Sequence, residues 1–440
     1  MRIVLIAEVY LPKVDGVVVR TTNLIRQLVA VGDEVTVICP DAGDEGTSQV
    51  PVVRLPSFEC VSYPEYRIGR PDARLLSTIE EIAPDVIHFV NPFAFGFQCF
   101  DVLARAGVRV PCLFSFHTLY GEFAKRYRLT KPVASVLWWL SRKYHNYADL
   151  NLTVSSTTQH DLQRRGFERV DLWPPAVDAE LFHPRRACAE MRSRLSGGQP
   201  HSPLLITVSR LAPEKNVKLL ADVLERLPGV RLAIVGDGPQ RAELERFFPS
   251  DKTTFVGYLA GEDLAAAYAS SDAFVFASET ETMGNVVLEA MASGLCVVAP
   301  RAGGIRSLVA ERETGLLFSA GAASEAAAHV RHLLSEPRQR HAISAAARRS
   351  AESCSWANAA AEVRGSYRKA AANHRSNGHA RSQSRAASRV LGGLVTTYRV
   401  AAVVNGYAKT FGGILNPPQP YANGSPGRRL LHDAHEMCGS

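Results

Sequence analysis

The strongest constraint on the fold is an alternation of short apolar runs with helical segments, which occurs twice along the 440 residues. In the first half, the apolar runs cover residues 2–8, 34–40, 86–90, 112–116 and 150–155, and helices are expected at about 21–31 and 73–82. Short strands that alternate with helices form parallel sheets with crossover helices. We therefore expect an α/β domain over residues 1–180.

The same pattern begins again after an irregular stretch at residues 184–203. It predicts strands at residues 204–210, 231–238, 253–258, 273–278 and 296–300, and helices at about 217–227, 239–247 and 262–269. Residues 200–355 are thus expected to form a second Rossmann-like domain, which faces the first across a cleft at the carboxyl ends of the strands.

The chain after residue 355 is predicted to serve a different purpose from the two domains. Residues 356–371 have helical spacing, and we expect this helix to pack back on the first domain. Residues 372–440 are rich in Asn, Ser, Arg and Gly, which is typical of a weakly ordered tail.

Composition and the lengths of the apolar runs argue against several classes of protein. The 8 cysteines are scattered without a C-x-x-C pair, so neither a zinc site nor a redox motif is indicated and a reducing compartment is favoured. The first ten residues predict a strand and not a signal peptide. No apolar run reaches the roughly 18 residues of a membrane span. We expect no metal and no cofactor, and a cytoplasmic location.

The segment "ETETMGNVVLEAMASG" at residues 279–294 predicts a ligand site. It places Glu281 on a strand-to-helix loop, followed by Met283, Gly284 and Asn285, and Glu289 in the second turn of the helix. Free amides at a helix start attract anions, whereas carboxylates favour hydroxyl groups. The pairing suits a ligand with phosphate and sugar hydroxyls. The alternative is that acidic residues simply favour the first turns of helices.

Cations and turns follow the neighbouring strands of the second domain. "VSRLAPEKN" places Arg210 and Lys215 on a loop, where they either neutralise a diphosphate or are solvated surface charges. Gly236 in "GDGP" and Tyr258 follow the next two strands. Because the carboxyl ends of parallel strands share one edge, we predict a nucleotide-diphosphate site there. The chain has no D-x-D pair, so the two cations would replace a divalent metal.

The first domain contributes two candidate residues to the same crevice. Gly16 follows the first strand and precedes a helix expected to start near Arg20, and a glycine there lets backbone approach a phosphate closely. The G-x-G-x-x-G fingerprint is absent, which argues against a dehydrogenase. His117 ends the strand at residues 112–116. A lone histidine is equally compatible with a structural role.

Three of these motifs, "GDGP", "ETETMGNVVLEAMASG" and "APRAGG", resemble the retaining glycosyltransferases of family four over about residues 1–370. The resemblance implies the GT-B fold, with Glu281 on the donor sugar and Glu289 on the ribose. It implies that Arg210 and Lys215 hold the diphosphate. The catalytic set implied is His117, Arg210, Lys215 and Glu281. The donor-binding set is Gly16, Arg210, Lys215, Gly236, Tyr258, Glu281, Met283, Gly284, Asn285 and Glu289.

Further segments resemble the sulfoquinovosyltransferases: "HFVNP", "WPPAVDAELFHP", "EMRSRLSGG", "IVGDGP" and "VVLEAMASGL". This resemblance implies a UDP-sugar donor and diacylglycerol or a related lipid as acceptor. Two places differ: Pro175 and Ala176 precede "VD" where a basic residue and a glycine are usual, and "HTLYGEF" replaces the usual "HTH". "GNVVLEA" also resembles lipid mannosyltransferases that use GDP-mannose, which remain the alternative.

A membrane acceptor fits a second feature of the first half. Residues 125–143, "KRYRLTKPVASVLWWLSRK", have basic ends around an apolar stretch with Trp138 and Trp139, a pattern typical of attachment to an anionic membrane and equally of a core helix with solvated ends. Arg67, Arg70 and Arg74 add further positive charge near the variable loop of the first domain. We expect a peripheral protein on the inner membrane face, or in the plastid of a photosynthetic eukaryote.

A non-catalytic nucleotide-sugar-binding protein is the alternative from another functional class. Such a sensor is expected to lose some of the four charged residues of the predicted site, whereas this chain keeps Arg210, Lys215, Glu281 and Glu289. Nucleic-acid binding is not expected, because the folded part has no basic stripe interleaved with exposed aromatic residues.

Overall fold

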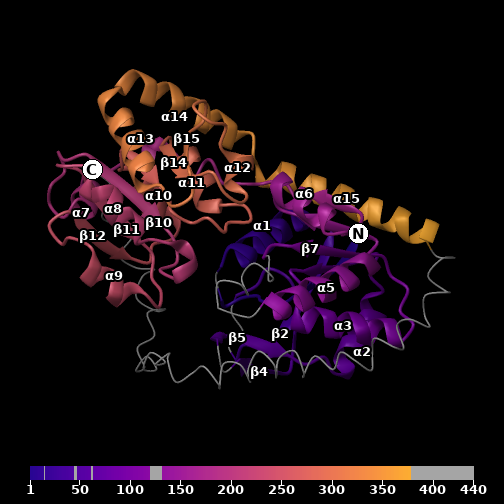
Figure 1. Ribbon diagram of the computed structural model, residues 1–440. Helices are drawn as coiled ribbons and strands as arrows, with labels where there is room; N and C mark the ends of the chain where they lie inside the picture. Colours follow the sequence, from indigo (N-terminus) through magenta and orange to yellow (C-terminus); the bar gives the residue numbers. More distant parts are fainter. Residues whose placement is uncertain (14, 44–46, 61–62, 119–130, 378–440) are drawn as a thin grey trace.

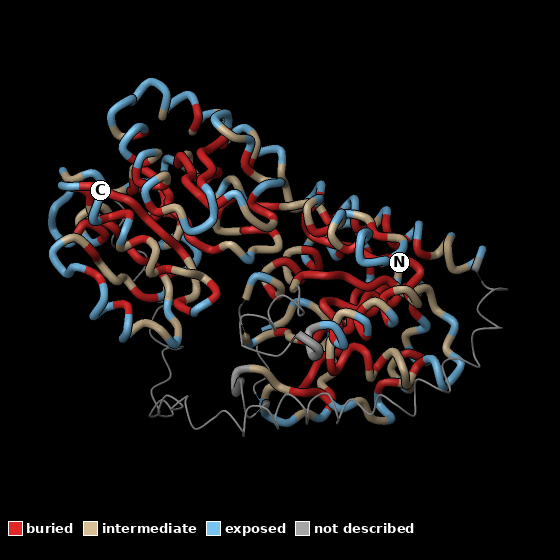
Figure 2. The backbone as a smooth tube through the Cα atoms, viewed as in Figure 1, coloured by how far each residue is buried: buried red, intermediate tan, exposed pale blue. Residues whose placement is uncertain are grey.

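The computed structural model describes residues 1–13, 15–43, 47–60, 63–118 and 131–377. They form two α/β domains, each with a twisted parallel sheet between layers of helices (Figure 1). Figure 2 shows the strands of both sheets buried and the outer faces of the helices exposed. The predicted fold class is confirmed.

The first domain is built on a seven-stranded parallel sheet in the order β3-β2-β1-β6-β7-β8-β9. The strands are β1 (Arg2–Ala7), β2 (Glu34–Pro40), β3 (Val52–Leu55), β6 (Val86–Val90), β7 (Cys112–Phe116), β8 (Leu150–Thr153) and β9 (Val170–Leu172). The helices are α1 (Gly16–Ala30), α2 (Ala73–Ile82), α3 (Ala94–Arg105), α5 (Lys131–Tyr147) and α6 (Ser156–Arg164). An antiparallel pair, β4 (Ser57–Cys60) and β5 (Tyr63–Gly69), lies beside this sheet.

The second domain has a six-stranded sheet in the order β12-β11-β10-β13-β14-β15. Its strands are β10 (Leu204–Val208), β11 (Arg231–Val235), β12 (Thr253–Gly257), β13 (Ala273–Val275), β14 (Cys296–Pro300) and β15 (Leu316–Phe318). Its longer helices are α7 (Ala189–Leu195), α8 (Leu219–Glu225), α9 (Arg241–Phe247), α10 (Gly261–Ala269), α11 (Asn285–Ala292), α13 (Ala323–Ser335) and α14 (Pro337–Glu352). Short turns are η1 (Pro184–Arg186), η2 (Pro213–Lys215) and α12 (Ile305–Leu308).

The last helix, α15 (Trp356–Asn377), leaves the second domain and lies along the first (Figure 1). Its buried residues Val363 and Tyr367 belong to the same apolar cluster as Leu24 and Leu28 of α1. The Arg364 guanidinium holds the fully buried Asp33 carboxylate, with an Nε–Oδ2 distance of 2.7 Å. The chain therefore crosses between the domains twice, which fixes the first domain to the second at both ends.

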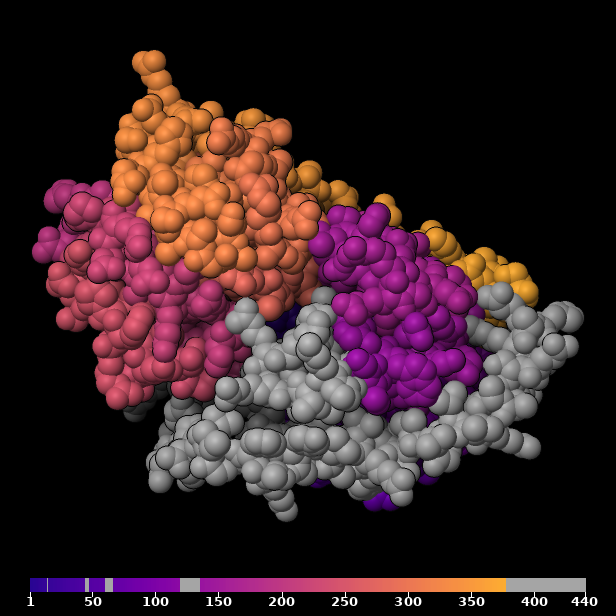
Figure 3. Space-filling view, in the orientation of Figure 1, coloured from indigo at the N-terminus to yellow at the C-terminus, as the bar shows by residue number. Residues whose placement is uncertain are grey.

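The two domains also touch directly. The Ser307 hydroxyl of α12 lies 3.1 Å from that of Ser156 and 2.9 Å from that of Thr157, at the start of α6. Figure 3 shows the lobes in contact along this edge. Within the described residues, no helix combines the length and apolar character needed to cross a bilayer.

Several boundaries differ from the predicted ones for local reasons. Helix α1 begins at Gly16 and not near residue 21, because the Asp15 side chain accepts hydrogen bonds from the amides of Val17 and Val18. The stretch at 184–203, expected to be irregular, contains η1 and α7. Helix α15 continues past the predicted end at residue 371 to Asn377, so the expected tail begins later; residues 378–440 lie outside the described residues.

Candidate functional site

The loop between β13 and α11 carries most of the predicted site residues. Gly284, the N-cap of α11, has φ 92°, a conformation that favours glycine. Two further glycines pack against the loop: a Cβ on Gly303 would lie 2.3 Å from the Glu281 carbonyl oxygen, and one on Gly304 would lie 2.1 Å from that of Thr282. The close approach of these two backbones leaves no room for a side chain at Gly303 or Gly304.

Lys215 and Glu281 form an ion pair across this loop, with Nζ and Oε1 separated by 2.5 Å. Lys215 ends the η2 turn after β10, and Glu281 comes from the loop after β13, so two neighbouring strands deliver the pair. Both side chains are largely buried, with 24% and 16% exposed. Arg210 lies on the same loop as Lys215 and is half-buried. A cation and a carboxylate therefore meet at the carboxyl edge of the second sheet.

The "GDGP" turn supports the loop that carries Arg210. A Cβ on Gly236 would lie 2.0 Å from the Ser209 carbonyl oxygen, and one on Gly238 would lie 2.5 Å from that of Leu211. The Leu211 amide donates a 2.9 Å hydrogen bond to the Asp237 carbonyl oxygen. Gly236 thus affects the site indirectly, because its lack of a side chain lets the backbone at Ser209, next to Arg210, pack against it.

Tyr258, also predicted to bind the donor, follows a strand that two others separate from β13 in the sheet. It follows the edge strand β12, and its side chain is 66% exposed. In the described part of the chain, no hydrogen bond or ring contact joins it to the other predicted site residues.

Glu289 lies in the second turn of α11, as predicted. Its Oε2 accepts a hydrogen bond of 3.1 Å from the Tyr268 hydroxyl. Burial raises the pKa of the Glu289 carboxyl to about 7, an effect that the Tyr268 hydrogen bond partly offsets. The carboxyl group is therefore divided between its neutral and charged forms near neutral pH.

The first domain faces this loop through Gly16. It is the first residue of α1, and a Cβ at this position would lie 3.2 Å from the Asn285 side-chain nitrogen. Within the described residues, the buried Oδ1 of Asn285 has no hydrogen-bond partner. The two helix starts, α1 and α11, thus approach each other where the sequence placed the diphosphate.

His117 is the second contact from the first domain. It follows β7, is buried, and its carbonyl oxygen accepts a 2.7 Å hydrogen bond from the Thr282 hydroxyl. Its Nε2 lies 3.0 Å from the Ser115 hydroxyl, which lies 2.9 Å from Nε2 of His88. Burial, followed by the charges of Arg20 and His88, holds the pKa of His117 well below its usual range. The ring is neutral at physiological pH.

Two residues at this contact between the domains were not among the predicted site residues. Thr282 links the loop between β13 and α11 to His117, and Arg20 of α1 donates a hydrogen bond to the Met283 sulfur at 2.7 Å. The sequence pattern could have identified Arg20, because it lies four residues before Leu24 and eight before Leu28, on the apolar stripe of α1. An arginine on an apolar stripe is rare without a specific partner.

Helix α5 carries a second surface of interest. Its buried face, with Leu137, Leu140 and Tyr144, packs in the domain core, whereas Val136 and Trp139 are 56% and 43% exposed. Trp138 differs from Trp139: it is half-buried, and its ring packs edge-on against Phe167 at 6.1 Å. The first part of the predicted membrane segment, residues 125–130, lies outside the described residues.

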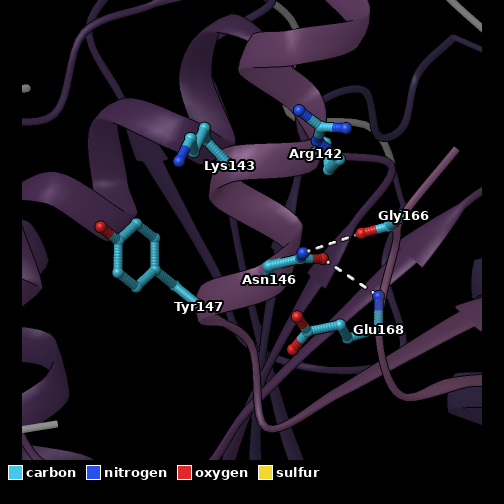
Figure 4. A pocket seen from close by; sticks show the side chains of 6 residues that line it. All are labelled: Arg142, Lys143, Asn146, Tyr147, Gly166 and Glu168. Atoms are coloured by element: carbon cyan, nitrogen blue, oxygen red, sulfur yellow. Dashed lines mark hydrogen bonds between the residues drawn. The ribbon is translucent and has the colours of Figure 1, made fainter.

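A surface pocket of about 410 Å³ lies at the end of α5, within the first domain. It is lined by Arg142, Lys143, Asn146, Tyr147, Gly166 and Glu168 (Figure 4). The Asn146 side chain joins two of the lining residues, because it donates to the Gly166 carbonyl oxygen at 3.0 Å and accepts from the Glu168 amide at 3.1 Å. No group of His, Cys, Asp and Glu residues suited to a metal occurs in the described part of the molecule.

Two family models match the two domains. The model described as "Glycosyltransferase Family 4" matches residues 14–181, and the one described as "Glycosyl transferases group 1" matches residues 195–350. The two matches together span all strands of the second sheet and every strand of the first except β1.

Three characterised relatives cover most of the chain. The sulfoquinovosyl transferase of Arabidopsis thaliana is 39% identical over 363 residues, covering 80% of this chain and 70% of the relative. A GDP-mannose-dependent alpha-mannosyltransferase of Mycobacterium tuberculosis is 36% identical over 377 residues, covering 83% and 96%. An alpha-monoglucosyldiacylglycerol synthase of Acholeplasma laidlawii is 25% identical over 358 residues, covering 77% and 89%.

Solved structures share the fold at lower identity. Sucrose-phosphate synthase from Thermosynechococcus elongatus superposes with a TM-score of 0.69 at 21% identity, covering 84% of this chain and 98% of that one. Anabaena HepE in complex with UDP and glucose gives a TM-score of 0.65 at 19% identity, with 82% and 98% covered.

Proposed function

The chain belongs to glycosyltransferase family 4 with the GT-B fold, and on this premise we propose that it transfers sulfoquinovose from UDP-sulfoquinovose to diacylglycerol with retention at the anomeric carbon. The observation that carries the reaction is the ion pair of Lys215 with Glu281, which lies beside the contact of His117 with Thr282. These contacts bring a cation, a carboxylate and the backbone of His117 to one place between the domains.

The sugar and the acceptor rest on the relatives. The Arabidopsis relative at 39% identity is named as a sulfoquinovosyl transferase, which supports the sugar. The Acholeplasma relative is named as a glucosyldiacylglycerol synthase, which supports a diacylglycerol acceptor for a member of the same family. The Mycobacterium relative, at 36% identity, supports one other reaction, mannosyl transfer from GDP-mannose.

The donor is held mainly by the second domain. Arg210 and Lys215 bind the diphosphate, and Gly16 and Asn285 approach it at the starts of two helices. Glu289 accepts hydrogen bonds from the ribose hydroxyls, and Glu281 accepts hydrogen bonds from hydroxyls of the transferred sugar. Donor binding separates Lys215 from Glu281, because the diphosphate becomes the partner of Lys215 and the sugar hydroxyls become the partners of Glu281.

The transfer needs no separate protein base. The acceptor hydroxyl approaches on the face of the leaving group, its oxygen forms the new bond to the anomeric carbon, and the bond to the UDP oxygen breaks. The electron pair stays on UDP, and the hydroxyl proton passes to a phosphate oxygen of UDP. Arg210 and Lys215 stabilise the charge that develops there, without a divalent metal.

The acceptor reaches the first domain from a membrane surface. Val136, Trp139 and Lys143 follow one another at spacings of three and four residues on the exposed side of α5, so apolar side chains and a cation share one face. This arrangement suits a helix that lies in the headgroup region of an anionic bilayer, and we place the protein on the inner, cytoplasmic face.

Initial rates with three donors test this proposal. Vesicles that contain diacylglycerol and anionic phospholipid are mixed with the full chain and UDP-sulfoquinovose, UDP-glucose or GDP-mannose. We expect fastest lipid glycosylation with UDP-sulfoquinovose. Product from GDP-mannose alone would favour the mannosyltransferase, and nucleotide binding without turnover of any donor would favour a non-catalytic binding protein.

A further inference from the structure

Arg20 is a buried cation at the boundary between the two domains. It comes from the second turn of α1 and is 2% exposed. One terminal nitrogen donates to the Met283 sulfur at 2.7 Å, and the other donates to the carbonyl oxygens of Trp173 and Pro174 at 3.2 and 2.9 Å. The guanidinium carbon also lies 4.8 Å from the centre of the Trp173 ring.

These partners leave the guanidinium group incompletely satisfied. Within the described residues, the Arg20 Nε has no hydrogen-bond partner, and no carboxylate contacts the side chain. A thioether sulfur is a weak acceptor for a charged donor. Burial accordingly lowers the pKa of Arg20 to about 9. A buried charge without a counterion is costly to keep, and such positions are typical of ligand sites.

Arg20 lies close to the residues assigned to the transferred sugar. Its partner Met283 is two residues after Glu281, to which the sugar hydroxyls are assigned. The Trp173 ring that packs against Arg20 also lies 4.9 Å from the ring of His117. Arg20 therefore neighbours the groups around the sugar, whereas no hydrogen bond or ion pair between described side chains links it to Lys215 or Glu289.

We propose that Arg20 is the residue that recognises the sulfonate group of the transferred sugar. The inference rests on the proposed function, because sulfoquinovose differs from glucose in carrying a sulfonate in place of the hydroxyl on carbon 6. A sulfonate stays charged at all physiological pH values and offers three acceptor oxygens. Two N–H groups of the guanidinium, the Nε–H and one on the nitrogen that contacts Met283, are not used by the described partners and can donate to such an anion.

The same contact explains discrimination against neutral sugars. A sugar with a hydroxyl on carbon 6 leaves the buried charge of Arg20 without a counterion, as it is in the free protein. The sulfonate removes that penalty on binding. The preference between the two donors should therefore depend on Arg20, while the affinity for UDP, which lacks the sugar, should not.

Calorimetry with the full chain tests this assignment in the absence of acceptor. The dissociation constants of UDP-sulfoquinovose, UDP-glucose and UDP are measured for the natural protein, Arg20→Met and Arg20→Lys. Arg26→Met is the matched control, since Arg26 is an exposed residue of the same helix that contacts only Asn23 among its described hydrogen-bond partners. Far-UV circular dichroism and a thermal melt report, independently of UDP, whether each variant is folded.

We expect the natural protein and Arg26→Met to bind UDP-sulfoquinovose roughly 10- to 100-fold more tightly than UDP-glucose, the range of a charge-assisted contact. Arg20→Met should reduce this ratio to about twofold at unchanged UDP affinity, and Arg20→Lys should retain part of it. A ratio that persists in Arg20→Met, or no preference in the natural protein, would overturn the assignment. Loss of UDP affinity in both folded Arg20 variants would indicate that Arg20 contacts the diphosphate and would also overturn the assignment to the sulfonate.

The lipid assay separates failure of this inference from failure of the proposed function. Sulfoquinovosyl diacylglycerol formed by Arg20→Met with an unchanged donor preference would contradict the role of Arg20 alone. Absence of this product with the natural protein, despite a donor preference that Arg20→Met abolishes, would contradict the proposed reaction and support the sulfonate subsite.

Discussion

Lys215 Nζ lies 2.5 Å from Glu281 Oε1, so the residue assigned to the donor phosphate and the residue assigned to the donor sugar are paired with each other in the free protein. Each neutralises its partner in a site that is largely buried. The pair keeps the two side chains in place for the donor, at the cost that the donor must break it.

Replacing Glu281 by Gln should lower turnover more than it lowers UDP affinity. The carboxylate contacts the transferred sugar, which UDP lacks, and its loss also frees Lys215 for the diphosphate. We expect turnover to fall by a factor of about 10–100, corresponding to a lost charge-assisted hydrogen bond. Steady-state rates and UDP calorimetry measure the two effects.

The exposed ion pair of Lys218 with Glu243 provides the matched control for this variant. Glu243→Gln removes a carboxylate from a Lys–Glu pair outside the site and should change neither quantity. Equal losses of turnover and of UDP affinity in Glu281→Gln would contradict its assignment to the sugar.

Arg210 and Lys215 should each be needed for turnover, and a divalent metal should not. Arg210→Ala and Lys215→Ala each remove a donor to the leaving diphosphate, which typically costs about 1.5–3 kcal/mol, or about 10- to 100-fold in rate. Activity should persist in EDTA. Complete loss of activity in EDTA that magnesium restores would show that these cations do not replace a metal.

Donor affinity should rise with pH through about 7. Burial raises the pKa of Glu289 to about 7, and the ribose hydroxyls are best accepted by its charged form. Below that pKa, affinity should fall by up to about tenfold per pH unit, as protonation competes with binding. Calorimetry with UDP-glucose between about pH 5.5 and 8.5 measures this dependence, because its diphosphate diester does not titrate there, whereas a terminal phosphate titrates near pH 6.

Glu289→Gln serves as the comparison in the same titration. The amide cannot ionise, so its donor affinity should be weaker and flat across this range. A pH dependence that survives in Glu289→Gln would have to come from another group and would contradict the ribose assignment.

Gly236→Ala should destabilise the second domain and lower turnover without touching the donor. Gly236 has φ 129°, and a Cβ would lie 2.0 Å from the Ser209 carbonyl oxygen, so the loop with Arg210 must move. We expect a loss of about 1–3 kcal/mol in the free energy of unfolding. Gly365→Ala is the control: it lies in α15 with no atom near its Cβ position and should be neutral or slightly stabilising. Denaturant melts distinguish the two.

Trp139→Ala should weaken binding to anionic vesicles and raise the KM for lipid while UDP affinity stays unchanged. The control is Phe247→Ala, which removes another exposed aromatic side chain, 51% exposed, from the second domain. Vesicle sedimentation and lipid-dependent rates measure both variants. Equal losses in the two variants, or none in either, would contradict a membrane face on α5.

The strand ends were the most predictable part of the molecule. Buried parallel strands read as apolar runs, and their carboxyl ends share one edge, so Lys215, Glu281 and His117 were placed near one another from spacing alone. The structure adds what spacing does not contain, the direct pairing of Lys215 with Glu281 and the hydrogen bond from Thr282 to His117.

Other parts of the site required the three-dimensional arrangement. The role of Gly236 depends on the approach of a loop 27 residues earlier, at Ser209, and Tyr258 follows an edge strand, which sequence order does not reveal. Arg20 gave a local signal on the apolar stripe of α1, but its partners Met283 and Trp173 are distant in sequence. Contacts between domains have no local pattern.

The configuration and identity of the lipid product test the central claim most directly. The full chain is incubated with UDP-sulfoquinovose and diacylglycerol vesicles, and the purified glycolipid is examined by proton NMR and mass spectrometry. The account predicts sulfoquinovosyl diacylglycerol with an α linkage, the configuration of the donor. A β-linked product would contradict retention, and a lipid glycosylated only when GDP-mannose replaces UDP-sulfoquinovose would contradict the proposed sugar.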